Sequence, residues 1–259
     1  SFMDISDSDR SLFLPVSRTD MEARGWEMCD FIFVSGDAYV DHPSFASALL
    51  GRLLESHGYK VGIIAQPDFT KTESFTILGR PRLAFLVSAG AMDSMVSNYT
   101  ANNKPRSEDA YAHGGEAGHR PDRALIAYTA KIREAYKGAA VIIGGIEASL
   151  RRMTHYDYWS NKVRRSVLLD SKADLLLYGM GEHSIIEVAE KLEQGIPIRQ
   201  IRDVRGTCWY TGKQNEVPSG DGIVMLPSFE EISADTGEGK QKFAESFVLQ
   251  DQTTVALNP

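Results

Sequence analysis

The sequence predicts a doubly wound α/β fold with a mostly parallel sheet, of the Rossmann or flavodoxin-like type. Two observations predict it. Short apolar runs recur along residues 30–179, each about as long as a buried strand. Stretches with apolar residues at helical spacing lie between several of these runs, and this alternation is typical of right-handed strand–helix–strand units.

The individual elements follow from local signals. Strands are expected at residues 30–36, 60–65, 83–88, 140–145 and 174–179. Helices are expected from Pro43 to Gly58, from Pro121 to Gly138 and over residues 182–193, because proline suits the first turn of a helix and glycine its end.

The rest of the chain is expected to flank this sheet. Residues 1–29 are predicted to form an amino-terminal arm that packs on the domain of residues 30–200. Residues 201–259 are predicted to be a small C-terminal extension and linker. Within it, residues 206–211 and 222–226 are expected to form an added hairpin, and residues 229–249 to be helical in two pieces split around Gly237 to Gly239.

Composition excludes several classes of protein. Hydrophobic residues make up 42% of the chain and charged residues 24%, as in ordinary globular domains. The net charge of −7 argues against nucleic acid as a partner of the chain as a whole. No apolar run approaches the roughly 20 residues that span a membrane, so no membrane partner is expected. Cys29 and Cys208 are too far apart for a zinc motif, and two free thiols suit the cytoplasm. We expect no metal site.

Ligands of open parallel sheets bind outside the carboxyl ends of the strands. The segment after the third expected strand, residues 88–120, is the most unusual there, because such connections usually take about two to six residues. It is interpreted as a lid or binding surface, or as a flexible or docking insertion. Gly144-Gly145 with Glu147, and Gly179 to Glu182, are each either a ligand-contacting turn or a tight structural turn.

A basic and aromatic stretch over residues 151–165 leaves a further alternative open. Arg151, Arg164 and Arg165 near Tyr158 and Trp159 are a pattern that can hold single-stranded nucleic acid by charge and stacking. The same aromatic residues can also simply pack against the sheet. No GxGxxG, GxxxxGK[ST], G-x-S-x-G or HExxH motif occurs. The sequence therefore does not indicate a nucleotide-binding protein, a hydrolase or a metalloprotease of the usual types.

Six segments, in this order, resemble the YgiQ-type radical SAM proteins and cover nearly the whole chain. They are residues 13–18 (FLPVSR), 33–43 (FVSGDAYVDHP), 62–67 (GIIAQP), 93–101 (DSMV and YTA), 144–152 (GGIEASLRR) and 155–159 (HYDYW). Residues 179–182 (GMGE) are similar to the Gly-x-Gly-Glu turn of the cobalamin-binding-like domains that precede many radical SAM cores.

The resemblance implies an amino-terminal, cobalamin-binding-like domain of a two-part enzyme. The other part would be a radical SAM core, in which a CxxxCxxC motif holds a [4Fe–4S] cluster and S-adenosylmethionine gives a 5′-deoxyadenosyl radical. Cys29 and Cys208 cannot supply that motif, so we expect the chain to end before the core and to lack catalytic residues of its own. Cobalamin is possible but not predicted, because Asp41-His42 does not match Asp-x-His-x-x-Gly. The resemblance implies no particular substrate.

Three hypotheses follow. The first is an accessory domain that contributes an active-site wall or a small-molecule pocket beside the radical SAM core. The second is a non-catalytic module that binds RNA or protein through residues 151–165. The third is a structural piece without ligand affinity. For the first, the expected ligand-binding or core-facing residues are Ser35, Asp37, Asp93, Asn98, Tyr99, Glu147, Arg151, His155 and Glu182.

Overall fold

The computed structural model describes residues 12–42, 46–212, 217–234 and 236–256. Pro43, the expected first residue of a helix, lies outside these residues. The chain divides into two compact units: Ser1–Arg152 with Val167–Tyr210, and Met153–Ser166 with Thr211–Pro259.

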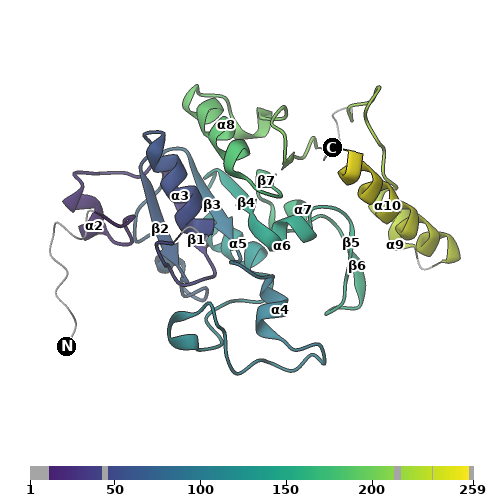
Figure 1. Ribbon diagram of the computed structural model, residues 1–259, viewed down its shortest axis with the longest axis horizontal. Coiled ribbons are helices and arrows are strands. Elements are labelled where there is room, and N and C mark those ends of the chain that lie inside the picture. The colour runs from purple at the N-terminus through teal and green to yellow at the C-terminus, as the bar shows by residue number, and fades with distance from the viewer. Residues whose placement is uncertain (1–11, 43–45, 213–216, 235, 257–259) are drawn as a thin grey trace. The chain divides into compact units, whose positions relative to one another are not determined.

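The first unit is built on a six-stranded sheet in the order β2-β1-β3-β4-β7-β8. Every neighbouring pair is parallel except β7 and β8, so the predicted mostly parallel α/β fold is confirmed (Figure 1). The strands are β1 Phe31–Ser35, β2 Val61–Ala65, β3 Ala84–Ser88, β4 Val141–Gly144, β7 Leu175–Leu177 and β8 Thr207–Cys208. The first five correspond to the five predicted strands. The order of those five parallel strands is the flavodoxin-like one, with its switch point between β1 and β3.

The predicted hairpin between residues 206–211 and 222–226 is wrong. Thr207–Cys208 pairs antiparallel with β7, and residues 222–226 form no strand. On the side away from β4, the backbone N–H and C=O groups of β7 need partners. Thr207–Cys208 supplies these partners.

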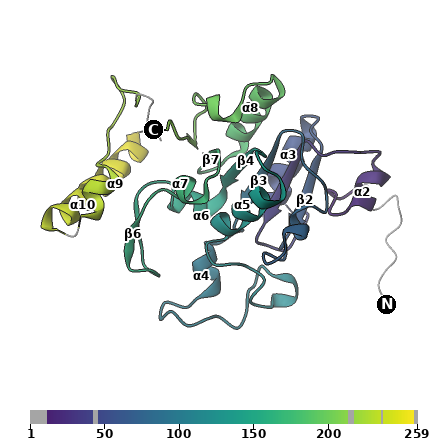
Figure 2. The ribbon, with the colours of Figure 1, turned by 180° about the vertical axis from the view of Figure 1, so that it is seen from behind.

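Helices cover both faces of the sheet, because successive side chains of each strand point to opposite sides. Phe31 and Phe33 of β1 pack in the core shared with α3 and α8. Ile32 and Val34 pack in the core shared with α5 and α7. Figures 1 and 2 show these two helix layers on the two sides of the sheet. The helices that pack on these two faces are α3 Ala46–Ser56, α5 Ala124–Ala135, α7 Val167–Ser171 and α8 Glu182–Glu193. The unit also contains α2 Arg18–Ala23, α4 Ser94–Asn98, α6 Gly145–Leu150, η1 Thr72–Phe75, η2 His113–Gly115 and η3 Ile198–Gln200.

The described residues before α2 contact the sheet through Leu14 and Pro15. Leu14 is buried in the core under α3. The carbonyl of Pro15 accepts a hydrogen bond of 2.8 Å from the amide of Ile63, so it covers part of the outer edge of β2. This contact protects an edge strand that would otherwise present unpaired backbone groups.

The second unit contains the antiparallel hairpin β5 His155–Asp157 and β6 Lys162–Arg164, and the helices α9 Phe229–Ser233 and α10 Gly237–Ala256. A capping box between Ser228 and Glu231 begins α9. The two predicted helical pieces are present, but the predicted break at Gly237 to Gly239 is wrong, because α10 begins at Gly237. Among the residues that the structure describes, no helix combines the length and the apolar character that a membrane crossing requires.

Candidate functional site

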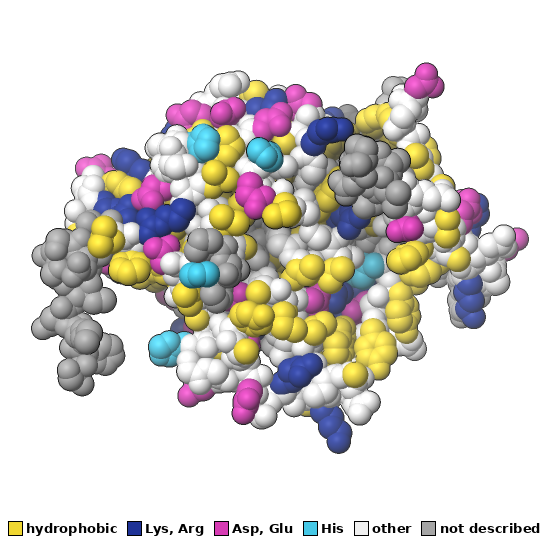
Figure 3. All heavy atoms as spheres, viewed as in Figure 1, with side chains coloured by type: hydrophobic (Ala, Val, Ile, Leu, Met, Phe, Trp, Pro, Cys, Tyr) yellow, Lys and Arg dark blue, Asp and Glu magenta, His cyan; other side chains and the backbone are white. Residues whose placement is uncertain are grey.

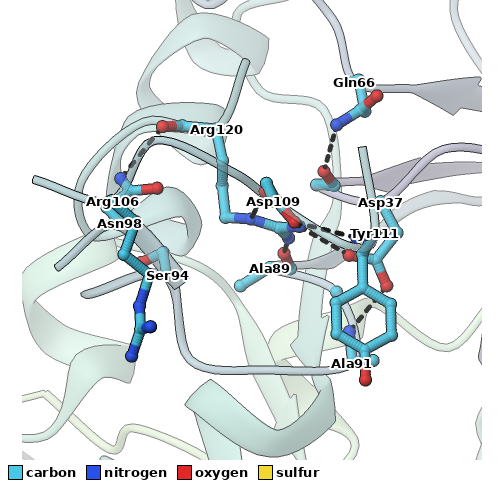
Figure 4. A network of polar contacts seen from close by, with 12 residues as sticks. Asp37, Gln66, Ala89, Ala91, Ser94, Asn98, Arg106, Asp109, Tyr111 and Arg120 are labelled. Atoms are coloured by element: carbon cyan, nitrogen blue, oxygen red, sulfur yellow. Dashed lines mark hydrogen bonds and ion pairs between the residues drawn. The ribbon is translucent and has the colours of Figure 1, made fainter. Parts of the chain in front are cut away.

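The carboxyl ends of the strands lie at one edge of the sheet, and the long segment of residues 89–120 folds over the crevice between β1 and β3. Its last residue, Arg120, places its guanidinium group in this crevice with none of the side chain exposed. The group donates to Asp37 Oδ1 at 2.8 Å, to Asp109 Oδ2 at 3.2 Å and to the carbonyl oxygen of Ala89 (Figure 4). The crevice where flavodoxin-like sheets hold their ligands is therefore filled by this chain's own arginine.

Glycine is required beside this network. Gly90 has a φ of +115°, and a Cβ atom there would collide with the Asp37 carboxylate and the Arg120 guanidinium. Burial raises the pKa of Asp37 above its usual range, although Arg120 acts in the opposite direction. Burial would lower the pKa of Arg120, but the two carboxylates next to it raise it.

A second set of hydrogen bonds holds the same segment at residues 111–113. Gln66, directly after β2, adopts a left-handed backbone conformation with a φ of +46°. Its amide nitrogen donates to the carbonyl of Gly36 at 3.2 Å, and its amide oxygen accepts from the backbone N–H of His113 at 3.0 Å. The backbone N–H of Ala38 also donates to the carbonyl of Tyr111 at 2.8 Å. Segment 89–120 is therefore tied to the ends of β1 and β2.

Glu147 joins three helices at the ends of β3 and β4. It lies in the first turn of α6 with 1% of its surface exposed. Oε1 accepts from the backbone N–H of Ser94 at 3.0 Å and from the Ser94 hydroxyl, and Oε2 accepts from the N–H of Leu125 at 3.1 Å. One carboxylate thus satisfies amide groups at the beginnings of α4 and α5. Burial and then Asp93 raise its pKa, against the effect of these donors.

Asp93 connects this cluster to Arg151. Its carboxylate caps α4 by accepting from the N–H groups of Met95 and Val96 at 3.0 and 3.4 Å. It also pairs with Arg151, whose Nε donates to Oδ2 at 2.8 Å. Arg151 therefore has an anionic partner within the chain itself.

The structure brings most of the expected site residues to this edge, where they bond to one another or to the chain. The hydroxyl of Ser35 accepts from the N–H of Asp37 at 3.1 Å. Asn98 and Tyr99 both donate to Asp122, at 2.8 and 2.7 Å, on the exposed side of α4. His155 belongs to the second unit, where its ring contacts the carbonyl of Met153 at 3.0 Å.

Sequence reasoning did not identify Arg120, Gln66 or Ser94 as site residues. Arg120 and Asp37 are 83 positions apart, and nothing in the local pattern around either residue indicates the other. The available signals were weak: Arg120 ends the long segment, and Gln66 directly follows a strand.

Glu182 lies at a separate apolar cavity on the face covered by α3 and α8. The cavity has a volume of about 140 Å³ and lies at the carboxyl ends of β3, β4 and β7. Its lining includes Phe33, Leu86, Ile142, Leu177, Met180 and Glu182. Of the expected site residues, only Glu182 lines this cavity. Gly145, with a φ of +86°, bends the chain beside it, and a Cβ there would come within 2.7 Å of the Ser88 hydroxyl.

The two thiols of the chain do not fit an iron–sulfur cluster. Cys29 precedes β1 and Cys208 lies on β8, with three strands between them in the sheet. Burial raises the pKa of each thiol to about 11, whereas cluster ligands must be thiolates that lie close together. Within the described ranges, no group of three or more His, Cys, Asp and Glu side chains is arranged to hold a metal ion.

Both thiols are therefore expected to resist alkylation in the folded chain. At pH 8, Cys29 and Cys208 should react with iodoacetamide at least about a hundredfold more slowly than in the urea-unfolded chain, because so little thiolate is present. Mass spectrometry of samples quenched over time measures both rates. Folded-state labelling of either residue at the unfolded rate would contradict the raised pKa values.

The fold and the site define a flavodoxin-like α/β domain with a closed switch-point crevice and an apolar cavity at the strand ends. The chain belongs to the radical SAM N-terminal family, which it matches over residues 13–258. The resemblance to YgiQ-type radical SAM proteins is thereby confirmed. The chain is 54% identical over 238 residues to a UPF0313 protein of Clostridium perfringens, and the alignment covers 92% of this chain and 35% of the relative.

Other relatives show the same proportions. A UPF0313 protein of Geobacter sulfurreducens is 54% identical over 237 residues, covering 92% of this chain and 38% of the relative. This chain thus spans about a third of the length of the curated relatives it matches. Among solved structures, the radical S-adenosylmethionine methyltransferase TsrM of Kitasatospora setae, with cobalamin and a [4Fe–4S] cluster bound, aligns with a TM-score of 0.46 and 17% identity. That alignment covers 71% of this chain and 28% of TsrM.

Proposed function

We propose that this chain is the accessory amino-terminal domain of a radical SAM enzyme, and that the [4Fe–4S] cluster and S-adenosylmethionine are held by a core outside these residues. Membership in the radical SAM N-terminal family supports the proposal. The positions and raised pKa values of Cys29 and Cys208 support placing the cluster elsewhere. The two free cysteines also suit a cytoplasmic location.

The observation that carries the proposal is the apolar character of the carboxyl edge of the sheet. Large hydrophobic side chains are exposed there after β1, on α4, on α6 and on the turn before α8. Figure 3 shows hydrophobic side chains gathered over α6. The exposed residues are Val40, Val96, Ile146, Leu150 and Met180, of which Met180 is 85% exposed. Clustered exposed apolar side chains favour an interaction surface, and we assign this one to the radical SAM core of the same protein.

Photo-crosslinking in the full-length protein tests this assignment. With p-benzoylphenylalanine in place of Ile146, which is 42% exposed on α6, we expect crosslinks to peptides from beyond residue 259. The matched control is Ile77, which is 44% exposed in the connection from η1 to β3. It should give several times fewer crosslinks to those peptides. Equal yields from the two positions would refute the assignment of this edge.

The alternative of an RNA- or protein-binding module through residues 151–165 has no support here. Arg151 is paired with Asp93, and the guanidinium of Arg152 lies 5.0 Å from the centre of the Tyr178 ring. Arg164 lies 4.0 Å from the buried carboxylate of Asp157. These arginines already have partners within their own units, so they do not form a free basic strip.

Cobalamin is not assigned to this domain. Asp41 accepts from Arg52 Nε at 3.1 Å and from the Tyr39 hydroxyl at 3.2 Å, so this carboxylate is used inside the fold. No motif of the Asp-x-His-x-x-Gly type places His42 as a ligand. Titration of the full-length protein with hydroxocobalamin, followed by absorbance, measures directly whether it binds.

A further inference from the structure

At the carboxyl edge of the sheet, the clusters around Arg120 and Glu147 leave one cavity unfilled among the described residues, and it lies under α3 and α8. It lies where β3, β4 and β7 end and where α8 begins. The neighbouring crevice between β1 and β3 is occupied by Arg120. A ligand that uses the carboxyl edge of this sheet therefore has the cavity as its available recess.

The volume and the lining of the cavity indicate what it can hold. Its volume is about 140 Å³. A dry protein cavity of about 150 Å³, lined by Leu, Ile and Phe side chains, binds benzene. Phe33, Leu86, Ile142 and Leu177 provide a lining of the same kind. One six-membered ring or a branched aliphatic group of similar volume therefore fits.

The charges around the cavity select against anions. Glu182 is the one charged side chain among the described residues that line it. Its carboxylate lies in the first turn of α8, where it offsets the positive end of that helix. A phosphate or carboxylate at this opening would lie near a like charge and find no arginine or lysine in the described lining.

We propose that this cavity binds an uncharged apolar group of about the size of one ring and discriminates against phosphate and carboxylate groups. The inference deepens the proposed function by naming a ligand class for the domain. The inference depends on the proposed function only for the use that the enzyme would make of the bound group. The binding measurement below is independent of crosslinking at Ile146, so the two can fail separately.

Two probes of the same shape test the proposal on this chain. With methionine methyl groups labelled with ¹³C, the Met180 signal reports on the cavity because this residue lines it. Benzyl alcohol is expected to shift that signal saturably. Benzoate and inorganic phosphate should bind at least about tenfold more weakly, since each places an anion beside Glu182. Glu182→Gln should raise the affinity for benzoate relative to that for benzyl alcohol, because it removes the like charge.

Variants that fill the cavity locate the binding site. Leu49→Trp enlarges a lining residue that is 37% exposed, and Leu169→Trp, also 37% exposed, enlarges a residue of α7 on the other face of the sheet. Benzyl alcohol binding should weaken severalfold in the first variant and stay unchanged in the second. Gly181→Ala is a milder filling, because its φ of −78° suits alanine and the nearest atoms to the new methyl group belong to Leu177 at 4.0 Å.

Three results would overturn the proposal. The first is binding of benzoate or phosphate as tightly as benzyl alcohol. The second is benzyl alcohol binding that neither Leu49→Trp nor Gly181→Ala weakens, because the probe would then occupy another place. The third is the absence of any saturable shift of Met180 with benzyl alcohol.

Discussion

Replacement of Arg120 by methionine is expected to lower the free energy of unfolding by about 3–5 kcal/mol, the usual cost of breaking a buried ion pair from one side. Methionine keeps much of the length of the side chain but leaves Asp37 and Asp109 without their shared cation. Only 6% and 5% of these two side chains are exposed. Urea unfolding, followed by circular dichroism, measures the loss.

The same variant should also release the long segment. The backbone N–H groups of Ala38 and His113, which donate to Tyr111 and Gln66, are expected to exchange with deuterium faster once Arg120 no longer holds the segment. The stability lost should be partly recovered at low pH, because burial raises the pKa of Asp37 and, without Arg120 to oppose this effect, the Asp37 carboxyl becomes neutral on protonation.

Lys104→Met is the matched control in the same segment. Lys104 is exposed, and its replacement should change stability by less than about 0.5 kcal/mol. If Arg120→Met costs less than about 1 kcal/mol, or if the protection of Ala38 and His113 is unchanged, the network at the switch point is not what holds the segment in place.

The fold was predictable because buried parallel strands have continuous apolar sequences. The runs that contain β1 and β4 carry this signal without any knowledge of the sheet. β8 was not predictable, because Thr207–Cys208 is only two residues long and is a strand solely through its pairing with Leu176 and Leu177. The expectation of a hairpin failed there because periodicity says nothing about which edge a short segment joins.

The candidate site was predictable in position but not in its pairings. Asp37, Asp93 and Glu147 each follow a predicted strand, so the shared direction of parallel strands places them at one edge. Their partners depend on contacts between distant segments: Asp93 pairs with Arg151, 58 positions away. Whether a polar residue at such an edge faces a ligand or completes the fold is decided by those contacts, which no local pattern contains.

These pairings separate two roles along one edge of the sheet. Asp37 accepts a hydrogen bond from Arg120, and Asp93 accepts one from Arg151. Glu147 accepts from amide groups at the beginnings of helices. The apolar surface and the cavity have no such partners in the described part of the chain. The polar residues therefore rigidify the edge, and the apolar residues are those that we propose contact a ligand or the radical SAM core.

Glu147→Gln is expected to destabilise the chain by about 1–3 kcal/mol at pH 5, because an amide carries two N–H donors where a carboxyl group carries at most one, and an amide N–H would face an N–H group of Ser94 or Leu125. The difference in the free energy of unfolding between the wild type and the variant should then become smaller as the pH rises to 8. Burial raises the pKa of Glu147 in the folded state, so between the unfolded and folded pKa values the native state binds more protons than the unfolded state. Raising the pH over this window lowers the stability of the wild type, whereas glutamine has no proton to lose.

Urea unfolding of both proteins between pH 5 and pH 8 measures this gap, with Glu187→Gln on the exposed side of α8 as the control. That replacement should stay within about 0.5 kcal/mol of the wild type at each pH. The result that would count against the argument is a gap that widens with pH. It would mean that the donors from Ser94 and Leu125 outweigh burial and hold the pKa of Glu147 below its usual value. The carboxylate would then be a permanently charged cap for α4 and α5, and the repulsion from Asp93 would be cancelled by the pairing of Asp93 with Arg151.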